Sequence, residues 1–136
     1  MKRKRIAVLI ISMLLASLVL SPSAYAVTTS IGGDVHTDAT WTYYSTVRYT
    51  GASGQIRLDL TNCTANTLQL YLRNAAGTRI SQTQYWPDSS GGYVAYVRAT
   101  GGTTFPAGQS FKFTGRLTKP IWDWEDNTWA GYLAYN

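Results

Sequence analysis

"QIRLDLTNCTANTLQLYLR", Gln55 to Arg73, decides the fold class of this 136-residue chain. Apolar side chains occupy every second position on both sides of a polar turn: Ile56, Leu58, Leu60, Leu68, Leu70 and Leu72. A period of two places one set of side chains on the core face of a β-strand and the other set in solvent. The stretch therefore predicts two strands joined by a turn at 62–66, with Tyr71 pointing outward, opposite the leucine face.

The same alternation recurs along residues 27–136. We predict seven or eight strands from it: about 27–37, 41–50, 55–61, 67–73, 79–86, 93–99, 110–118, and a closing hairpin of 119–124 with 128–135. Turn signals rich in glycine, proline and asparagine separate these segments, which is the rhythm of a sandwich or barrel. No segment has a helical period. The chain is therefore expected to be all-β, a small antiparallel β-sandwich of jelly-roll or immunoglobulin-like topology.

One stretch resembles a known family. Leu58 to Ser81, "LDLTNCTANTLQLYLRNAAGTRIS", is similar to the strand–turn–strand unit of the pre-peptidase C-terminal domain, a secreted bacterial β-sandwich module. In that family an apolar strand is followed by "LxLYLxxxxGT", the pattern that Leu68 to Thr78 reproduces. The resemblance implies a sandwich appended to, or secreted alongside, proteins that act outside the cell. It carries no functional residue onto this chain.

Residues 1–26 are expected to be a cleaved secretory signal peptide. Lys2 to Arg5 are all basic, and Ile6 to Leu20 form an apolar or small-residue run of 15. Ala24 and Ala26 supply small residues at the positions that a signal peptidase recognises. The apolar run is shorter than the roughly 20 residues of a membrane-spanning helix, although an uncleaved anchor is the alternative. We therefore expect residues 27–136 to be one secreted domain, with no membrane span after cleavage.

The charge of the secreted part argues against nucleic acid. Four of the twelve basic residues lie in the signal peptide, so residues 27–136 keep eight basic and seven acidic side chains, a net charge of +1. The eight cations are scattered singly along the sequence, whereas nucleic-acid binding needs a clustered basic face. We therefore expect no nucleic-acid partner.

The residues that carry most catalytic chemistry are scarce. His36 is the sole histidine and Cys63 the sole cysteine, so a structural zinc site lacks its four ligands and a serine–histidine–aspartate triad has one possible base. Asp123 and Glu125 could pair as in a glycosidase, but a domain of this size offers little cleft. Cys63 is expected to be a buried, inert side chain, with an interchain disulfide or a reactive thiol as alternatives. We expect no enzyme activity.

The sharpest functional signal is "IWDWEDNTW", Ile121 to Trp129, which places three of the five tryptophans among three acidic residues. Indole faces stack on the apolar faces of sugar rings, and an exposed aromatic patch usually marks a binding surface. Trp122, Trp124 and Trp129 are therefore the leading ligand-binding candidates. The alternative is that all three tryptophans fill the core of a last hairpin.

Further candidates lie around this signal and elsewhere. Tyr71, Tyr85 and Trp86 are the additional candidate ligand-binding residues, the last two because they precede a flexible "PDSSGG" loop. Carboxylates provide the hard oxygen ligands that calcium prefers. The candidate metal ligands are Asp123, Glu125 and Asp126. No other cofactor is expected.

These observations favour a secreted, monomeric, non-catalytic module that binds an extracellular glycan or a cell-envelope surface. One alternative is a protein–protein effector, such as an inhibitor or a bacteriocin-like toxin, that uses the same aromatic side chains to hold a protein partner. Another is a structural matrix protein that self-associates through its sheet edges.

Overall fold

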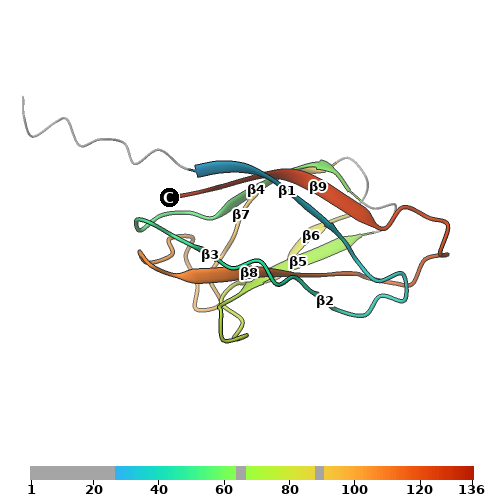
Figure 1. Ribbon diagram of the computed structural model, residues 1–136, viewed down its shortest axis with the longest axis horizontal. Coiled ribbons are helices and arrows are strands. Elements are labelled where there is room, and N and C mark those ends of the chain that lie inside the picture. Colours follow the sequence, from blue (N-terminus) through green and yellow to red (C-terminus); the bar gives the residue numbers. More distant parts are fainter. Residues whose placement is uncertain (1–26, 64–66, 88–90) are drawn as a thin grey trace, which may run out of the picture.

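The computed structural model describes residues 27–63, 67–87 and 91–136 (Figure 1). The expected signal peptide lies outside these residues. A membrane-crossing helix would require a long apolar helical stretch, and the described residues contain none. The described elements are nine strands: β1 (Val27–Asp34), β2 (Thr42–Tyr43), β3 (Arg48–Tyr49), β4 (Arg57–Asn62), β5 (Leu68–Arg73), β6 (Gln84–Trp86), β7 (Gly92–Ala95), β8 (Ser110–Leu117) and β9 (Thr128–Tyr135).

Two antiparallel sheets lie face to face, so the predicted all-β sandwich is confirmed (Figure 1). The four-stranded sheet has the strand order β1-β9-β4-β7. The five-stranded sheet has the order β2-β8-β5-β6, and β3 also pairs with β8. The long strands β8 and β9 therefore occupy interior positions, and the rings of Phe113 and Trp129 meet across the core with 5.8 Å between their centres.

The core is built from the inward positions of the alternating strands. Its buried hydrophobic residues on strands β4, β5, β8 and β9 are Leu58, Leu60, Leu68, Leu70, Leu72, Phe111, Phe113, Leu117, Trp129 and Leu133. Burying one aliphatic or phenyl side chain of this kind stabilises a fold by about 1.5–3 kcal/mol relative to its exposed state. The inward sets predicted for 55–61, 67–73 and 110–118 are confirmed, whereas Gln69 and Thr114, which were expected to face solvent, are buried as well. Cys63 is also buried, as expected.

The predicted hairpin of 119–124 with 128–135 is wrong. Strand β9 pairs instead with β1 over eight register positions and with β4 on its other side. Pro120 has no backbone N–H to give to a strand ladder. The next residues close on themselves, because the Glu125 N–H donates to the Trp122 carbonyl at 2.9 Å and the Trp122 N–H donates to Glu125 Oε2 at 2.9 Å. Residues 118–127 are consequently a loop.

The predicted strand at 41–50 is interrupted. Strands β2 and β3 each pair with β8, but residues 44–47 between them belong to neither strand. The Tyr44 N–H still donates to the Phe113 carbonyl of β8 at 3.3 Å, and the Tyr44 ring turns inward and packs edge-on against Trp129 with 5.7 Å between ring centres. Three other strands are shorter than predicted. The strand predicted for 27–37 ends at Asp34, that for 79–86 begins only at Gln84, and that for 93–99 ends at Ala95.

Tyr96 places a hydroxyl group in the core. The side chain is fully buried and its ring lies 6.0 Å from that of Phe113. Its oxygen has no hydrogen-bond partner among the described residues. Burial raises the pKa of Tyr96 well above its ordinary value, so the hydroxyl is neutral but still lacks the hydrogen bonds that water would give it.

We expect the Tyr96→Phe variant to be more stable than the wild type by about 1 kcal/mol or more, because the substitution removes an unsatisfied polar group and keeps the ring. Urea unfolding measures the difference in the free energy of unfolding. Tyr132→Phe is the matched control, since Tyr132 is exposed and should not change it. A loss of stability in Tyr96→Phe would mean that the hydroxyl has a partner.

Candidate functional site

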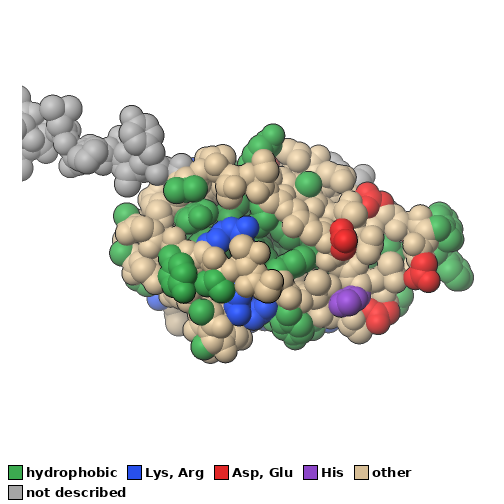
Figure 2. All heavy atoms as spheres, in the orientation of Figure 1, with side chains coloured by type: hydrophobic (Ala, Val, Ile, Leu, Met, Phe, Trp, Pro, Cys, Tyr) green, Lys and Arg blue, Asp and Glu red, His purple; other side chains and the backbone are tan. Residues whose placement is uncertain are grey.

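The loop between β8 and β9, residues 118–127, is the tryptophan loop. Trp122 and Trp124 are 70% and 81% exposed there, the two most exposed tryptophans of the described chain. The loop lies at the same end of the sandwich as the connection from β1 to β2 (Figure 1). Figure 2 shows hydrophobic side chains at this end with acidic side chains beside them. The first two candidates from the sequence therefore do form an exposed aromatic surface.

Hydrogen bonds to the β1–β2 connection brace this loop. The Ile121 N–H donates to the Thr37 carbonyl at 2.8 Å, and the Thr37 hydroxyl donates to Asp123 Oδ1 at 2.9 Å. At the end of the loop, Asn127 donates from Nδ2 to the Val35 carbonyl at 2.7 Å, and the Val35 N–H donates back to the Asn127 carbonyl at 3.0 Å. The backbone that carries the two indoles is held on both sides.

A second set of bonds shapes the exit of the loop. Asp126 Oδ1 accepts from the Thr128 hydroxyl at 2.7 Å and from the Thr128 N–H at 2.9 Å. These two donors lower the pKa of Asp126, the side-chain bond having the larger effect. The pKa of Asp38 in the neighbouring connection is lowered in the same way by Thr40. Asp38 and Asp126 therefore stay ionised at neutral pH, and a ligand at this end meets negative charge on a pre-shaped surface.

The three carboxylates proposed as calcium ligands do not converge. Asp123 is bonded to Thr37, Glu125 to the backbone of Trp122, and Asp126 to Thr128. No group of three or more His, Cys, Asp or Glu side chains in the described residues is placed to hold a metal ion. The arrangement instead leaves carboxylate oxygens around the two indoles, where they can accept hydrogen bonds from hydroxyl groups.

The other candidate residues are placed elsewhere. Trp129 is only 2% exposed, and its Nε1–H donates to the Tyr44 hydroxyl at 2.8 Å, so it belongs to the core. Trp86 is buried and donates to the Gly92 carbonyl at 3.1 Å. Tyr71 and Tyr85 lie on the outer face of the five-stranded sheet, as their register positions require. The fold thus separates these four residues from the tryptophan loop.

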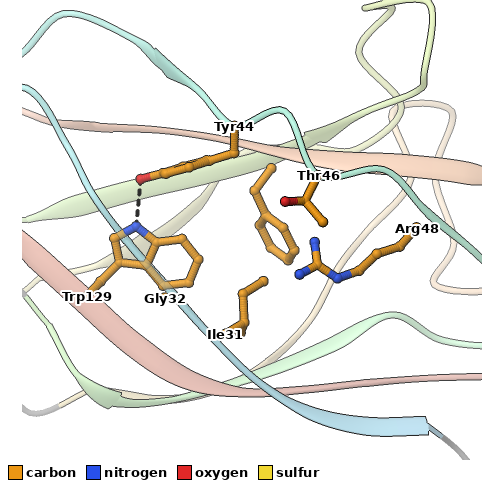
Figure 3. Close-up of a pocket in the computed structure, with 7 residues that line it drawn as sticks. Ile31, Gly32, Tyr44, Thr46, Arg48 and Trp129 are labelled. Atoms are coloured by element: carbon orange, nitrogen blue, oxygen red, sulfur yellow. Dashed lines mark hydrogen bonds between the residues drawn. The ribbon is translucent and has the colours of Figure 1, made fainter.

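A small cavity opens between the sheets at the β1 edge (Figure 3). Arg48 occupies an inward position there, and its guanidinium points toward Ile31 and Thr46 (Figure 3). Burial raises the pKa of Tyr44, on the cavity wall, to about 12, so its hydroxyl stays protonated and donates to the Asp34 carbonyl at 2.7 Å. The cavity volume is about 50 Å³, enough for one or two water molecules and too small for a sugar ring.

A shallow groove on the outer face of the four-stranded sheet was not predicted. It has a volume of about 220 Å³. Tyr93 on β7 and Tyr132 on β9 are both exposed and are the two register partners of Asp59 on β4. Arg57 lines the same groove. Alternation marked Asp59 as outward-facing, but only strand pairing places two tyrosines beside it.

The exposed aromatic side chains thus fall on different surfaces: the tryptophan loop, the groove of the four-stranded sheet and the outer face of the five-stranded sheet. No protein-family model, curated protein or solved structure matches this chain.

Proposed function

We propose that residues 27–136 form a secreted, non-catalytic module that binds an extracellular glycan through the tryptophan loop. The observation that carries this proposal is the exposure of Trp122 and Trp124 on a braced loop. Apolar surface left in water costs about 25 cal/mol per Å² compared with the same surface buried. The two indoles lie outside the core, so a ligand that covers them removes apolar surface from water, and this favours binding.

The neighbouring groups indicate the kind of glycan. The flat indole faces offer stacking area for the C–H faces of sugar rings. Asp123 and Glu125 present carboxylate oxygens that accept hydrogen bonds from sugar hydroxyls. The same carboxylates disfavour an anionic polymer through like-charge repulsion. A neutral cell-envelope or matrix polysaccharide fits this loop best.

The bracing of the loop favours binding as well. Association loses affinity when side chains and loops must be ordered, at about 0.5–1.5 kcal/mol for each immobilised side chain. The bonds from Thr37 to Asp123 and from Asn127 to Val35 fix the loop before any ligand arrives. Only the two indole side chains therefore have to lose conformational freedom when a ligand binds.

The test is retention of residues 27–136 on insoluble neutral polysaccharides and on purified cell-wall material. We expect the Trp122→Ala/Trp124→Ala variant to lose at least tenfold in affinity, which corresponds to about 1.4 kcal/mol. Tyr49→Ala is the matched control, because Tyr49 is exposed on β3, away from the loop. Thermal unfolding verifies that each variant is folded.

A further variant, Tyr93→Ala/Tyr132→Ala, separates the loop from the groove. If this variant loses binding while the tryptophan variant keeps it, the glycan site is the groove and the tryptophan loop has another role. If the wild type is retained on none of the polysaccharides, the glycan proposal is wrong, and the indoles are left as contacts for a protein.

A further inference from the structure

Two pairs of cations from distant parts of the sequence gather on the outer face of the five-stranded sheet. This set, the cationic face, consists of Arg73, Arg79, Lys112 and Arg116. Arg73 is the register partner of Lys112 across β5 and β8, and it also forms a β-bridge with Arg79. Arg116 follows Lys112 by four residues on β8, about 13 Å along the strand. Strand pairing therefore brings together basic residues that lie singly along the sequence.

The hydrogen-bond partners of these cations are all neutral within the described residues. Arg73 donates from Nε to the Thr114 hydroxyl at 2.9 Å and from Nη2 to the Tyr44 carbonyl at 2.9 Å. Arg116 donates from Nε to Gln69 Oε1 at 3.0 Å. The remaining bonds run from Arg79 to the Ser81 carbonyl and the Thr83 hydroxyl, and from Lys112 to the Ala75 carbonyl. Each side chain is held in place, and none of these bonds, all within the part of the chain that the structure describes, goes to an acidic group.

Aromatic rings hold the guanidinium groups close to the sheet. The Arg116 guanidinium lies 4.3 Å from the centre of the Trp41 ring, and that of Arg79 lies 4.8 Å from the Tyr71 ring. The Trp41 and Tyr71 rings meet edge-on at 5.0 Å. Because guanidinium groups cover these two rings, we assign the rings the role of positioning the cations. Fixed positive charge is what this face offers a ligand.

We propose that the cationic face binds a linear polyanionic polysaccharide, whose carboxylate or sulfate groups recur along the polymer. Guanidinium groups pair with such oxyanions through charge-assisted hydrogen bonds. Charges that extend over about 13 Å of strand β8 suit a polymer with several anionic groups better than a single small anion. Trp41 and Tyr71 are covered by guanidinium groups, but Tyr43 and Tyr85 are exposed, so single-stranded nucleic acid, which stacks its bases on open rings, is the competing partner that the experiment tests. This surface is separate from the tryptophan loop, and the proposal does not depend on the loop.

The experiment measures binding of residues 27–136 to polygalacturonate, which carries carboxylates, and to dextran sulfate, with neutral dextran as the control. We expect binding to one or both polyanions and none to dextran. The Arg73→Gln/Arg116→Gln variant should bind at least tenfold more weakly at low salt. Its slope of log affinity against log salt concentration should fall by about two, one for each removed cation.

The matched control is Arg57→Gln/Lys119→Gln, which removes the same charge away from the cationic face. An equal loss in this control would mean that net charge alone drives binding and would overturn the proposal. Because Arg73 and Arg116 also make structural hydrogen bonds, Arg79→Gln/Lys112→Gln serves as a second variant and should weaken binding similarly. Tighter binding to single-stranded DNA or to phosphatidylglycerol vesicles than to both polysaccharides would replace the proposed partner, and no binding to either polyanion would refute it.

Discussion

Replacing Trp129 by alanine should lower the free energy of unfolding by about 3–5 kcal/mol, whereas replacing Trp124 should change it by less than about 0.5 kcal/mol. Both residues belong to one short stretch of the sequence, but only Trp129 lies in the core. Its ring contacts Tyr44 and Phe113, with 5.7 and 5.8 Å between ring centres. Alanine would leave a cavity between the sheets and would remove the Nε1–H bond to the Tyr44 hydroxyl. Trp124 contributes no comparable burial.

Urea unfolding of the two variants, followed by circular dichroism, measures this contrast. Trp129→Phe is an informative intermediate, because it keeps an aromatic ring and removes the indole donor. It should cost less than Trp129→Ala, and part of its cost, about 1 kcal/mol, should come from the lost hydrogen bond. Equal costs for Trp124→Ala and Trp129→Ala would show that the Trp124 indole is packed in the folded protein. The tryptophan loop would then not be an exposed binding surface.

Replacing Gly131 by alanine should destabilise the protein by about 3 kcal/mol or more. Gly131 is buried on β9, opposite Leu60 of β4, beside an irregularity in the pairing register. A β-carbon at Gly131 would lie 2.9 Å from the Leu60 α-carbon and would clash with the Asp59 carbonyl oxygen. Both obstacles are backbone atoms of the adjacent strand, so relief requires β4 and β9 to move apart. Overpacking of this kind disrupts the ladder as well as the core.

Gly51→Ala is the control for this substitution. A β-carbon at Gly51 would meet its nearest heavy atoms, in Asn136, at 3.8 and 4.0 Å. This is ordinary contact, so the variant should keep wild-type stability or gain slightly through a less flexible unfolded chain. Thermal or urea unfolding measures both variants. If Gly131→Ala proves as stable as Gly51→Ala, strands β4 and β9 are not as close as described here.

The alternation of side chains predicted which residues face the core but not which strands pair with one another. A period of two tells which face of a sheet a side chain occupies, so the leucines of β5 and the phenylalanines of β8 could be placed in the core from the sequence. It does not tell which strand is the neighbour. The last segment was therefore paired with 119–124, its closest neighbour in sequence, whereas its partners β1 and β4 come from distant parts of the chain.

The same distinction explains the candidate surfaces. Trp122 and Trp124 were found because the acidic, aromatic stretch is local in sequence, although their exposure comes from a loop and not from the strand face that we predicted. Trp129 and Trp86 share their residue type but lie on strands that turn them inward. The cationic face could not be found by spacing, because Arg73 and Lys112 become neighbours only when β5 pairs with β8. Outward positions on both strands were predicted, and their alignment was the missing information.

The pairing of β1 with β9 has a consequence for how the protein folds. These strands are the first and last of the described chain, and β9 also supplies the inner partner of β4. Contacts between such distant segments form slowly, since the chain loses entropy in closing the long loop before the contacts stabilise it. Until residues 128–135 are available, β1 lacks the one strand it pairs with among the described elements, and β4 lacks one side of its ladder. The four-stranded sheet is then incomplete, so the core between the two sheets is covered on both sides only after the last strand has been made.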